Sequence, residues 1–243
     1  MPEGMSLLYP PSRCPHCFKT LKPYENLPIV GWLALRGRCS RCRSKISYRY
    51  PLVEAVTAGL FLIIFGQFGW TWQTPAYWLF FSWLLALSLI DLDTFTLPHA
   101  LTSSGVIMGL VVQVWFGLVS ADPFSTTLSL LLQSILGAVL GLWLFDLIRI
   151  LGLLALGQEA MGGGDSKLVA MIGAWLGWKL MLLAAFLGCA IGAFMGGAAI
   201  ALGLLSRRQP IPFGPFLALG GAIATLYGEP ILKAYLSWLG LAP

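Results

Sequence analysis

Four cysteines near the amino terminus have the spacing of a metal site. They form two C-x-x-C pairs, Cys14–Cys17 and Cys39–Cys42, which are separated by 21 residues. Each pair would sit in a tight turn that points two thiolates at one ion, and two such pairs are typical of four-cysteine zinc sites. Because protein atoms would fill all four positions, the predicted Zn²⁺ is structural. Two disulfides or two redox pairs are the alternative, which a reducing cytoplasm disfavours.

Three aspartates in apolar surroundings could carry out hydrolysis. Asp91 and Asp93 end one apolar run, and Asp165 opens another. An ionisable group in a membrane span is costly and indicates a functional site. Two nearby carboxylates would share a proton, so that the ionised group activates a water while the protonated group donates to a scissile carbonyl. Asp91 and Asp93 lie about 200° apart on a helix, so only one of them can face Asp165.

The residues just before Asp165 suit this chemistry. Gly162, Gly163 and Gly164 precede it, and glycines let a backbone pass close and turn sharply while leaving room for an extended peptide. A flexible loop that ends in an aspartate as a helix N-cap is an equally good interpretation of the local sequence. Nothing in the periodicity requires Asp91 and Asp165 to meet.

The elements that must position these groups are membrane helices. The 243 residues are 58% hydrophobic and 10% charged, with a mean hydropathy of +0.81, whereas soluble domains carry about 25% charged residues. This composition excludes a soluble globule and a disordered chain. We predict an all-α polytopic membrane protein with about seven transmembrane helices and no cleavable signal peptide before them. The predicted spans are 52–69, 75–93, 99–119, 125–152, 166–178, 180–205 and 211–240, the last interrupted at Gly228-Glu229-Pro230.

Charge divides the chain into two parts. Residues 1–50 hold nine of the 15 Lys and Arg residues and two acidic residues, a net charge of +7, while the rest carries −2. We therefore predict a zinc-binding head over 1–50 and a membrane domain over 51–243. The positive-inside rule puts the head in the cytoplasm, and with it the helix ends that carry Asp91 and Asp165. A basic head could instead bind nucleic acid or anionic lipid, but a topology signal is the simpler interpretation.

Small residues recur every four positions in the predicted spans. They include the triple Gly188, Gly192 and Gly196 and the pairs 137/141 and 105/109. This spacing lets helix backbones approach closely in lipid, so we expect tight packing at these glycines.

Several motifs together resemble those of one enzyme family. Besides the cysteine pairs they are Arg49-Tyr-Pro-Leu-Val-Glu54, Ile90-Asp-Leu-Asp before Leu97-Pro98, Met161-Gly-Gly-Gly-Asp165-Ser-Lys-Leu168 and Pro210-Ile-Pro-Phe-Gly-Pro215. Over residues 10–240 the chain resembles the bacterial type IV prepilin peptidases, the bifunctional leader peptidases and N-methyltransferases of type IV pilus and type II secretion systems. Its G-x-G-D element alone is also similar to that of other intramembrane aspartyl proteases, such as presenilins.

The resemblance implies an activity and a place in the cell. Such enzymes cleave the short basic leader of a prepilin or pseudopilin on the cytoplasmic side of the bacterial inner membrane, and then methylate the new N-terminal residue with S-adenosylmethionine. We accordingly expect prepilin and membrane lipid as partners, and no nucleic acid. The resemblance assigns catalysis to Asp91 and Asp165, supporting roles to Asp93, Gly162, Gly164 and Lys167, and metal binding to Cys14, Cys17, Cys39 and Cys42.

Some features depart from the family pattern. Its members usually have a further membrane helix before the head, and they carry Asp or Asn where this chain has His99. No glycine-rich Rossmann turn for S-adenosylmethionine is visible. Glu54 is a weak candidate for contacting the pilin amine or the methyl donor, and pairing with a nearby arginine is the simpler interpretation. A peptidase without methyltransferase activity, an ion-coupled transporter and a zinc-headed scaffold without chemistry are the alternative functions.

Overall fold

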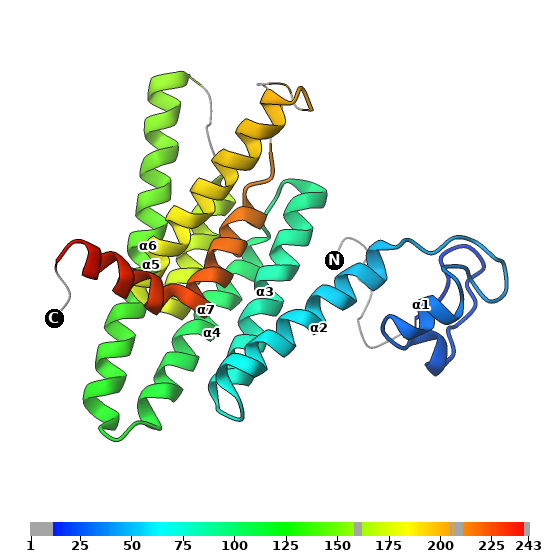
Figure 1. The fold of residues 1–243 in the computed structure, drawn as a ribbon, viewed down its shortest axis with the longest axis horizontal. Helices are drawn as coiled ribbons and strands as arrows, with labels where there is room; N and C mark the ends of the chain where they lie inside the picture. Colours follow the sequence, from blue (N-terminus) through cyan, green and yellow to red (C-terminus); the bar gives the residue numbers. More distant parts are fainter. Residues whose placement is uncertain (1–11, 158–161, 205, 207–210, 241–243) are drawn as a thin grey trace. The chain divides into compact units, whose positions relative to one another are not determined.

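The computed structural model describes residues 12–157, 162–204, 206 and 211–240. Regular structure within these residues is helical, apart from two isolated β-bridges, which confirms the predicted all-α class. The chain divides into two compact units after Gly66, and Figure 1 shows the course of each. Met161 and Pro210, which belong to the motifs quoted above, lie outside the described residues.

The first unit is a small head followed by one long helix. The head contains η1 (Pro23–Asn26) and α1 (Val30–Ala34), and α2 (Arg49–Phe68) belongs to this unit up to Gly66. The two β-bridges, 13 with 20 and 38 with 45, each close a turn around one cysteine pair. Among the described residues before α2, the buried hydrophobic side chains are those of Cys14 and Cys39. A segment with so little core needs another source of stability, such as a metal.

The second unit is a helical bundle. It comprises α3 (Gln73–Thr94), α4 (His99–Leu118), α5 (Pro123–Leu156), α6 (Gly163–Ala201) and α7 (Gly214–Trp238). Together with α2, six helices in the described part of the chain are long and apolar enough to cross a membrane. The chain is therefore a multi-pass membrane protein.

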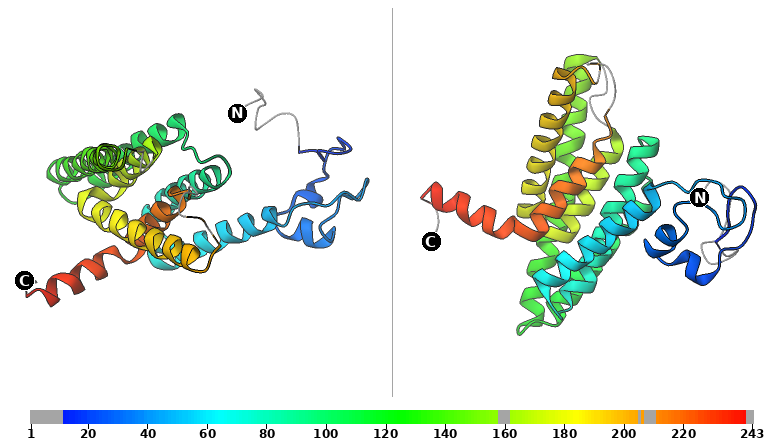
Figure 2. Two further views of the ribbon diagram at one scale, coloured as in Figure 1. Left: turned by 90° about the horizontal axis from the view of Figure 1, so that it is seen from above. Right: turned by 45° about the vertical axis from the view of Figure 1, so that its right-hand side comes forward.

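α6 consists of two helical arms. Gly177 has φ 75° and ψ 172°, values outside any helix. Asp165 and Cys189 lie 12 residues on either side of it and interact electrostatically, whereas one straight helix would hold them about 36 Å apart. The chain therefore reverses at Gly177, and the predicted segments 166–178 and 180–205 correspond to the two arms, which can be followed from yellow-green to gold in Figures 1 and 2.

The count of spans differs from the prediction for the same reason. The first arm, residues 163–176, is shorter than the roughly 20 residues that a spanning helix needs. The structure thus has six helices of spanning length where seven spans were predicted. α7 also differs, because the predicted interruption at 228–230 is a bend: the helix continues through Pro230 to Trp238. Proline removes a helical N–H and clashes with the preceding turn, and the red end of α7 turns away from its orange beginning in Figure 1.

Glycines allow the helices of the bundle to approach closely. A Cβ on Gly137 of α5 would lie 2.7 Å from the carbonyl oxygen of Gly173 in the first arm of α6. A Cβ on Gly109 of α4 would lie 2.7 Å from the ring of Trp175, which is buried in the same arm. The expected close packing at these glycines is confirmed, and it anchors the arm that carries Asp165.

Candidate active site and metal centre

Asp91 and Asp165 come together at one end of the bundle. Asp91 lies in the last turn of α3, and Asp165 lies in the first turn of α6. Although 74 positions separate them in the sequence, the two carboxylates interact electrostatically, and each residue is only 6% exposed. Two buried carboxyl groups that interact in this way cannot both ionise cheaply. The pair is therefore suited to hold a single proton between them.

α7 contributes a third element to this site. The backbone N–H of Gly214, the first residue of α7, donates a buried hydrogen bond of 2.8 Å to Oδ2 of Asp91. A Cβ at position 214 would lie 2.8 Å from the same oxygen, so the contact requires a glycine. The motif around Gly214 was visible in the sequence, but nothing local connects it to a partner 123 positions earlier.

The three glycines before Asp165 have different surroundings. The backbone of Gly162 lies against the Asp165 carboxylate, and a Cβ there would be 3.8 Å from Oδ2. A Cβ on Gly163 would meet the end of the Arg149 side chain, whereas a Cβ on Gly164 would lie 2.8 Å from Cβ of the buried Leu97. None of the three has a positive φ. These glycines are therefore not needed for a left-handed backbone, and Gly164 serves a close approach of backbone to side chain.

The other residues predicted to support the site have their own surroundings. Asp93 is exposed at the end of α3, on a different side from Asp91. Lys167 is half-buried and lines, with His99, a cavity of about 330 Å³ bordered by α4, α5 and α6. Glu54 belongs to the first unit, where its Oε2 accepts a 2.7 Å hydrogen bond from the N–H of Ile29.

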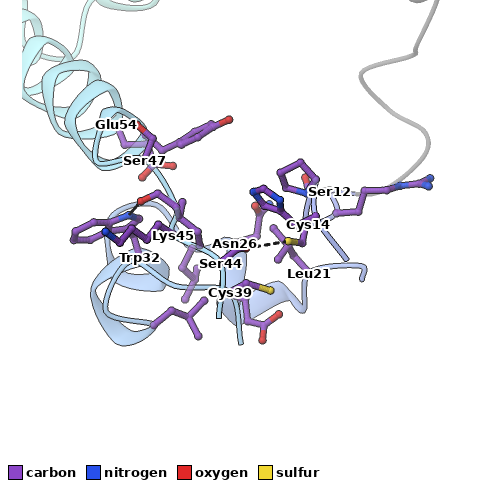
Figure 3. A pocket seen from close by; sticks show the side chains of 18 residues that line it. Ser12, Cys14, Leu21, Asn26, Trp32, Cys39, Ser44, Lys45, Ser47 and Glu54 are labelled. Atoms are coloured by element: carbon purple, nitrogen blue, oxygen red, sulfur yellow. Dashed lines mark hydrogen bonds between the residues drawn. The ribbon is translucent and has the colours of Figure 1, made fainter. Parts of the chain in front are cut away.

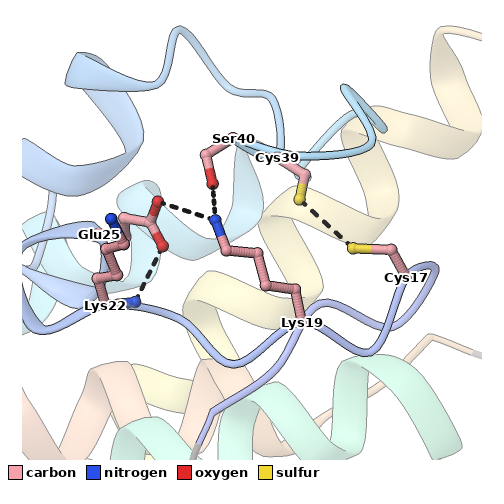
Figure 4. Close-up of polar contacts among 6 residues, drawn as sticks. All are labelled: Cys17, Lys19, Lys22, Glu25, Cys39 and Ser40. Atoms are coloured by element: carbon pink, nitrogen blue, oxygen red, sulfur yellow. Dashed lines mark hydrogen bonds and ion pairs between the residues drawn. The ribbon is translucent and has the colours of Figure 1, made fainter.

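The four cysteines of the head form a cluster that fits one metal ion. Their Sγ atoms all lie within 4.8 Å of one another. The Cys14–Cys42 sulfurs are 3.8 Å apart and the Cys17–Cys39 sulfurs 3.9 Å apart (Figure 4 shows the latter pair). A tetrahedral zinc site with Zn–S bonds of about 2.3 Å has S···S edges of about 3.8 Å. The cluster could therefore hold a metal ion in a tetrahedron.

Hydrogen bonds make the four thiols unequal. Backbone N–H groups, foremost that of Cys17, lower the pKa of Cys14 to about 6. The Ser44 hydroxyl, 3.1 Å from Cys42, lowers the pKa of that thiol as well. The Lys19 N–H lowers the pKa of Cys17, but partial burial and hydrogen bonds with the other three thiols raise it to about 11. Deprotonated sulfur is the metal ligand, so the Cys14 thiolate forms at near-neutral pH and a bound cation would favour loss of the other protons.

A polar brace joins the two halves of the cysteine cluster. Lys19, which follows the first pair, donates a 2.9 Å hydrogen bond to Ser40 of the second pair and lies 3.8 Å from the carboxylate of Glu25 (Figure 4). The backbone N–H of Lys22 also donates to Glu25 at 2.9 Å. That N–H, together with Ser40 and Lys19, holds the pKa of Glu25 below its usual value. The brace therefore holds the two C-x-x-C turns next to each other.

The head also encloses a cavity of about 420 Å³. Trp32 and Glu54 lie on one side of it and Cys14 and Asn26 on the other, as Figure 3 shows. Most of its lining is apolar, and the charged lining residues are two carboxylates, Glu25 and Glu54, and two cations, Arg13 and Lys45. The cavity has room for a small organic molecule.

Comparison with known proteins shows what the chain is similar to. Residues 1–68 match the description "Bacterial Peptidase A24 N-terminal domain", and residues 78–197 match "Type IV leader peptidase family". Proteins called prepilin leader peptidase/N-methyltransferase are similar over nearly the whole chain. That of Stutzerimonas stutzeri is 39% identical over 98% of this chain and 79% of its own length, and that of Pseudomonas aeruginosa is 41% identical over 97% and 78%.

A third relative with the same name, from Aeromonas hydrophila, is 42% identical over 96% of this chain and 77% of its own length. No solved structure matches the chain. Two family descriptions in the expected order, and three relatives aligned over nearly all of this chain, leave one assignment: this chain belongs to the type IV leader peptidase family.

Proposed function

We propose that this chain removes the leader peptide from prepilins or pseudopilins by aspartyl proteolysis, with Asp91 and Asp165 as the catalytic pair. The observation that supports this most directly is the meeting of two buried carboxylates from the ends of α3 and α6. Membership of the leader peptidase family supports the substrate class. Burial excludes bulk water, which strengthens the coupling between the two groups.

The pair can carry out hydrolysis with one shared proton. The ionised carboxylate takes a proton from a water, whose oxygen attacks the scissile carbonyl carbon, and the protonated carboxyl group gives its proton to the carbonyl oxygen. The tetrahedral intermediate then collapses as the C–N bond breaks, and the proton taken from water passes to the leaving amine. The carbonyl oxygen's proton returns to the pair, which is restored to its single-proton state.

A second reaction, methylation of the new N-terminus, uses S-adenosylmethionine in this proposal. The relatives' names include an N-methyltransferase, and the head cavity is the candidate site because Trp32 and Glu54 could contact a sulfonium cation. Bound there, S-adenosylmethionine supplies a methyl group to a neutral amine. Equilibrium dialysis with the labelled compound should show binding that Trp32→Ala weakens and Asp91→Ala leaves intact. Equal binding by Trp32→Ala would reject this cavity.

The metal and the orientation complete the proposal. Zn²⁺ is the ion that four thiolates in a tetrahedron favour, and it would be structural because protein atoms occupy every position. We propose that the chain lies in the bacterial inner membrane with its head and active site in the cytoplasm. Exposed basic residues of the head, Arg36, Arg38, Arg41 and Arg43, support this orientation. Protease protection in vesicles of known sidedness tests it.

The decisive experiment is cleavage of a purified prepilin by variants of the catalytic pair. Asp91→Ala and Asp165→Ala should each abolish leader removal while leaving the melting temperature in detergent unchanged. Asp93→Ala should cause a milder loss, because its side chain is exposed on another side of α3. Retained cleavage by either alanine variant of the pair rejects the proposal. Complete loss in Asp93→Ala with an active Asp91→Ala would exchange the roles of these two residues.

Methylation is read separately, by mass spectrometry of the processed pilin. An added methyl group on its N-terminus supports the bifunctional enzyme, and a processed but unmethylated pilin supports the alternative of a peptidase alone.

A further inference from the structure

At the start of α7, one backbone N–H has no backbone acceptor, and it points at the catalytic pair. The first N–H groups of a helix have no acceptor within the helix. Pro215 has no N–H, and the N–H of Phe216 donates to the carbonyl of Phe213 at 3.1 Å. Among the first three residues of α7, only Gly214 therefore has an N–H that lacks a backbone acceptor. This N–H donates to Oδ2 of Asp91. With Oδ2 engaged, Oδ1 of Asp91 is the oxygen left to act on water.

The glycine triple of α6 holds this donor in place. In the second arm of α6, Cβ atoms on Gly188, Gly192 and Gly196 would lie 3.0 Å from Cα of Leu217, 2.9 Å from the ring of Phe213 and 3.2 Å from Cδ1 of Ile211. All three partners belong to α7 or to the residues that lead into it. The entry to α7 is thus packed against α6 over about two helical turns, at the level of the aspartates.

We propose that Gly214 is a positioning residue for proteolysis, so that α7 forms part of the active site although it contributes no side chain to the reaction. Its N–H fixes the orientation of the Asp91 carboxylate relative to Asp165, and the absence of a side chain at 214 makes this possible. Each residue of the Phe-Gly-Pro sequence then has a physical role. Phe213 packs its ring on α6, Gly214 supplies the N–H donor, and Pro215 has no N–H that could compete with it. This inference rests on the proposed function of Asp91 and Asp165.

The test is the kinetics of Gly214→Ala on a purified prepilin. The new methyl group would stand 2.8 Å from Oδ2, so the carboxylate must leave its position. A hydrogen bond to a charged group contributes about 1.5–3 kcal/mol, so kcat should fall between about 10- and 150-fold. KM should stay near the wild-type value, because the contact is to a catalytic carboxylate.

Gly221→Ala is the matched control. Position 221 lies on the same face of α7, two turns further along, and a Cβ there would meet Cδ1 of Ile172 at 3.2 Å. This variant should keep a kcat close to that of the wild type. A loss of kcat in Gly221→Ala equal to that in Gly214→Ala would overturn the proposal, because it would indicate a general effect on helix packing.

Phe213→Ala gives a second route should Gly214→Ala fail to fold. It removes the ring packed at Gly192 but keeps the Gly214 donor and adds no atom near Asp91. We expect a smaller fall in kcat with an unchanged KM, and a wild-type kcat in Phe213→Ala would overturn the proposal.

Failure of this inference can be distinguished from failure of the proposed function. If Asp91→Ala and Asp165→Ala are inactive but Gly214→Ala is normal, only this inference fails; if the aspartate variants are active, the proposed function fails.

Discussion

Gly164→Ala should strongly reduce the rate of proteolysis, whereas Gly162→Ala and Gly163→Ala should change it little. The three glycines look equivalent in the sequence, but the structure gives them different neighbours. At 164 a methyl group would lie 2.8 Å from Cβ of Leu97 and 3.3 Å from its Cγ and Cδ1. Carbon atoms prefer separations of about 3.5–4.0 Å. Leu97 is only 9% exposed, between α3 and α4, and has little room to yield.

The size of the effect follows from this overlap. Adding a methyl group to a well-packed site costs about 1–3 kcal/mol. The start of α6 must move away from Leu97, and it carries Asp165 away from Asp91. If the whole cost appears in the transition state, kcat for prepilin cleavage falls about 5- to 150-fold.

The controls are the two glycines that precede Gly164. A Cβ on Gly163 would be 3.3 Å from Nη1 of Arg149, the far end of a flexible side chain. A Cβ on Gly162 would have Oδ2 of Asp165 as its nearest neighbour, at 3.8 Å. Steady-state cleavage of a purified prepilin should therefore rank Gly164→Ala well below both. Leu97→Ala removes the contacts with Cγ and Cδ1 but keeps the 2.8 Å contact with Cβ, so it should restore only a small part of the activity of Gly164→Ala. Equal activity of the alanine variants at 163 and 164 would refute the reasoning.

Three further outcomes follow from the head and the bundle. Cys39→Ser should release the metal bound by the full chain, measured by elemental analysis, and expose the head to protease; unchanged metal content would argue against the site. The head should become more sensitive to protease in acid, because the stabilisation from the lowered pKa of Glu25 is complete above its unfolded-state pKa and is lost as the pH falls through the lower folded-state value. Glu25→Gln should lack this dependence, and an unaltered pH profile would contradict the brace. Gly173→Leu should prevent folding, because its side chain would overlap the backbone of Gly137; a normal yield and melting temperature in detergent would count against that contact.

Local patterns account for much of this protein. Apolar runs of about 20 residues must become helices in lipid, since no other open structure satisfies the backbone there. The metal site could also be predicted from the sequence, because each C-x-x-C turn places its two ligands by local geometry alone. Helical geometry also separated Asp91 from Asp93, one buried and the other exposed, and the motifs led to the family that the comparisons show.

What the tertiary structure alone decided are the contacts between distant segments. Charge placement predicted the same side of the membrane for Asp91 and Asp165, but only the packing of α3 and α6 decided that their carboxylates interact. The donor on Gly214 and the packing of Gly164 on Leu97 join residues 123 and 67 positions apart. Such contacts depend on how whole helices pack through their glycine faces, and helices that are apolar on every side carry no periodic signal of which face meets which neighbour.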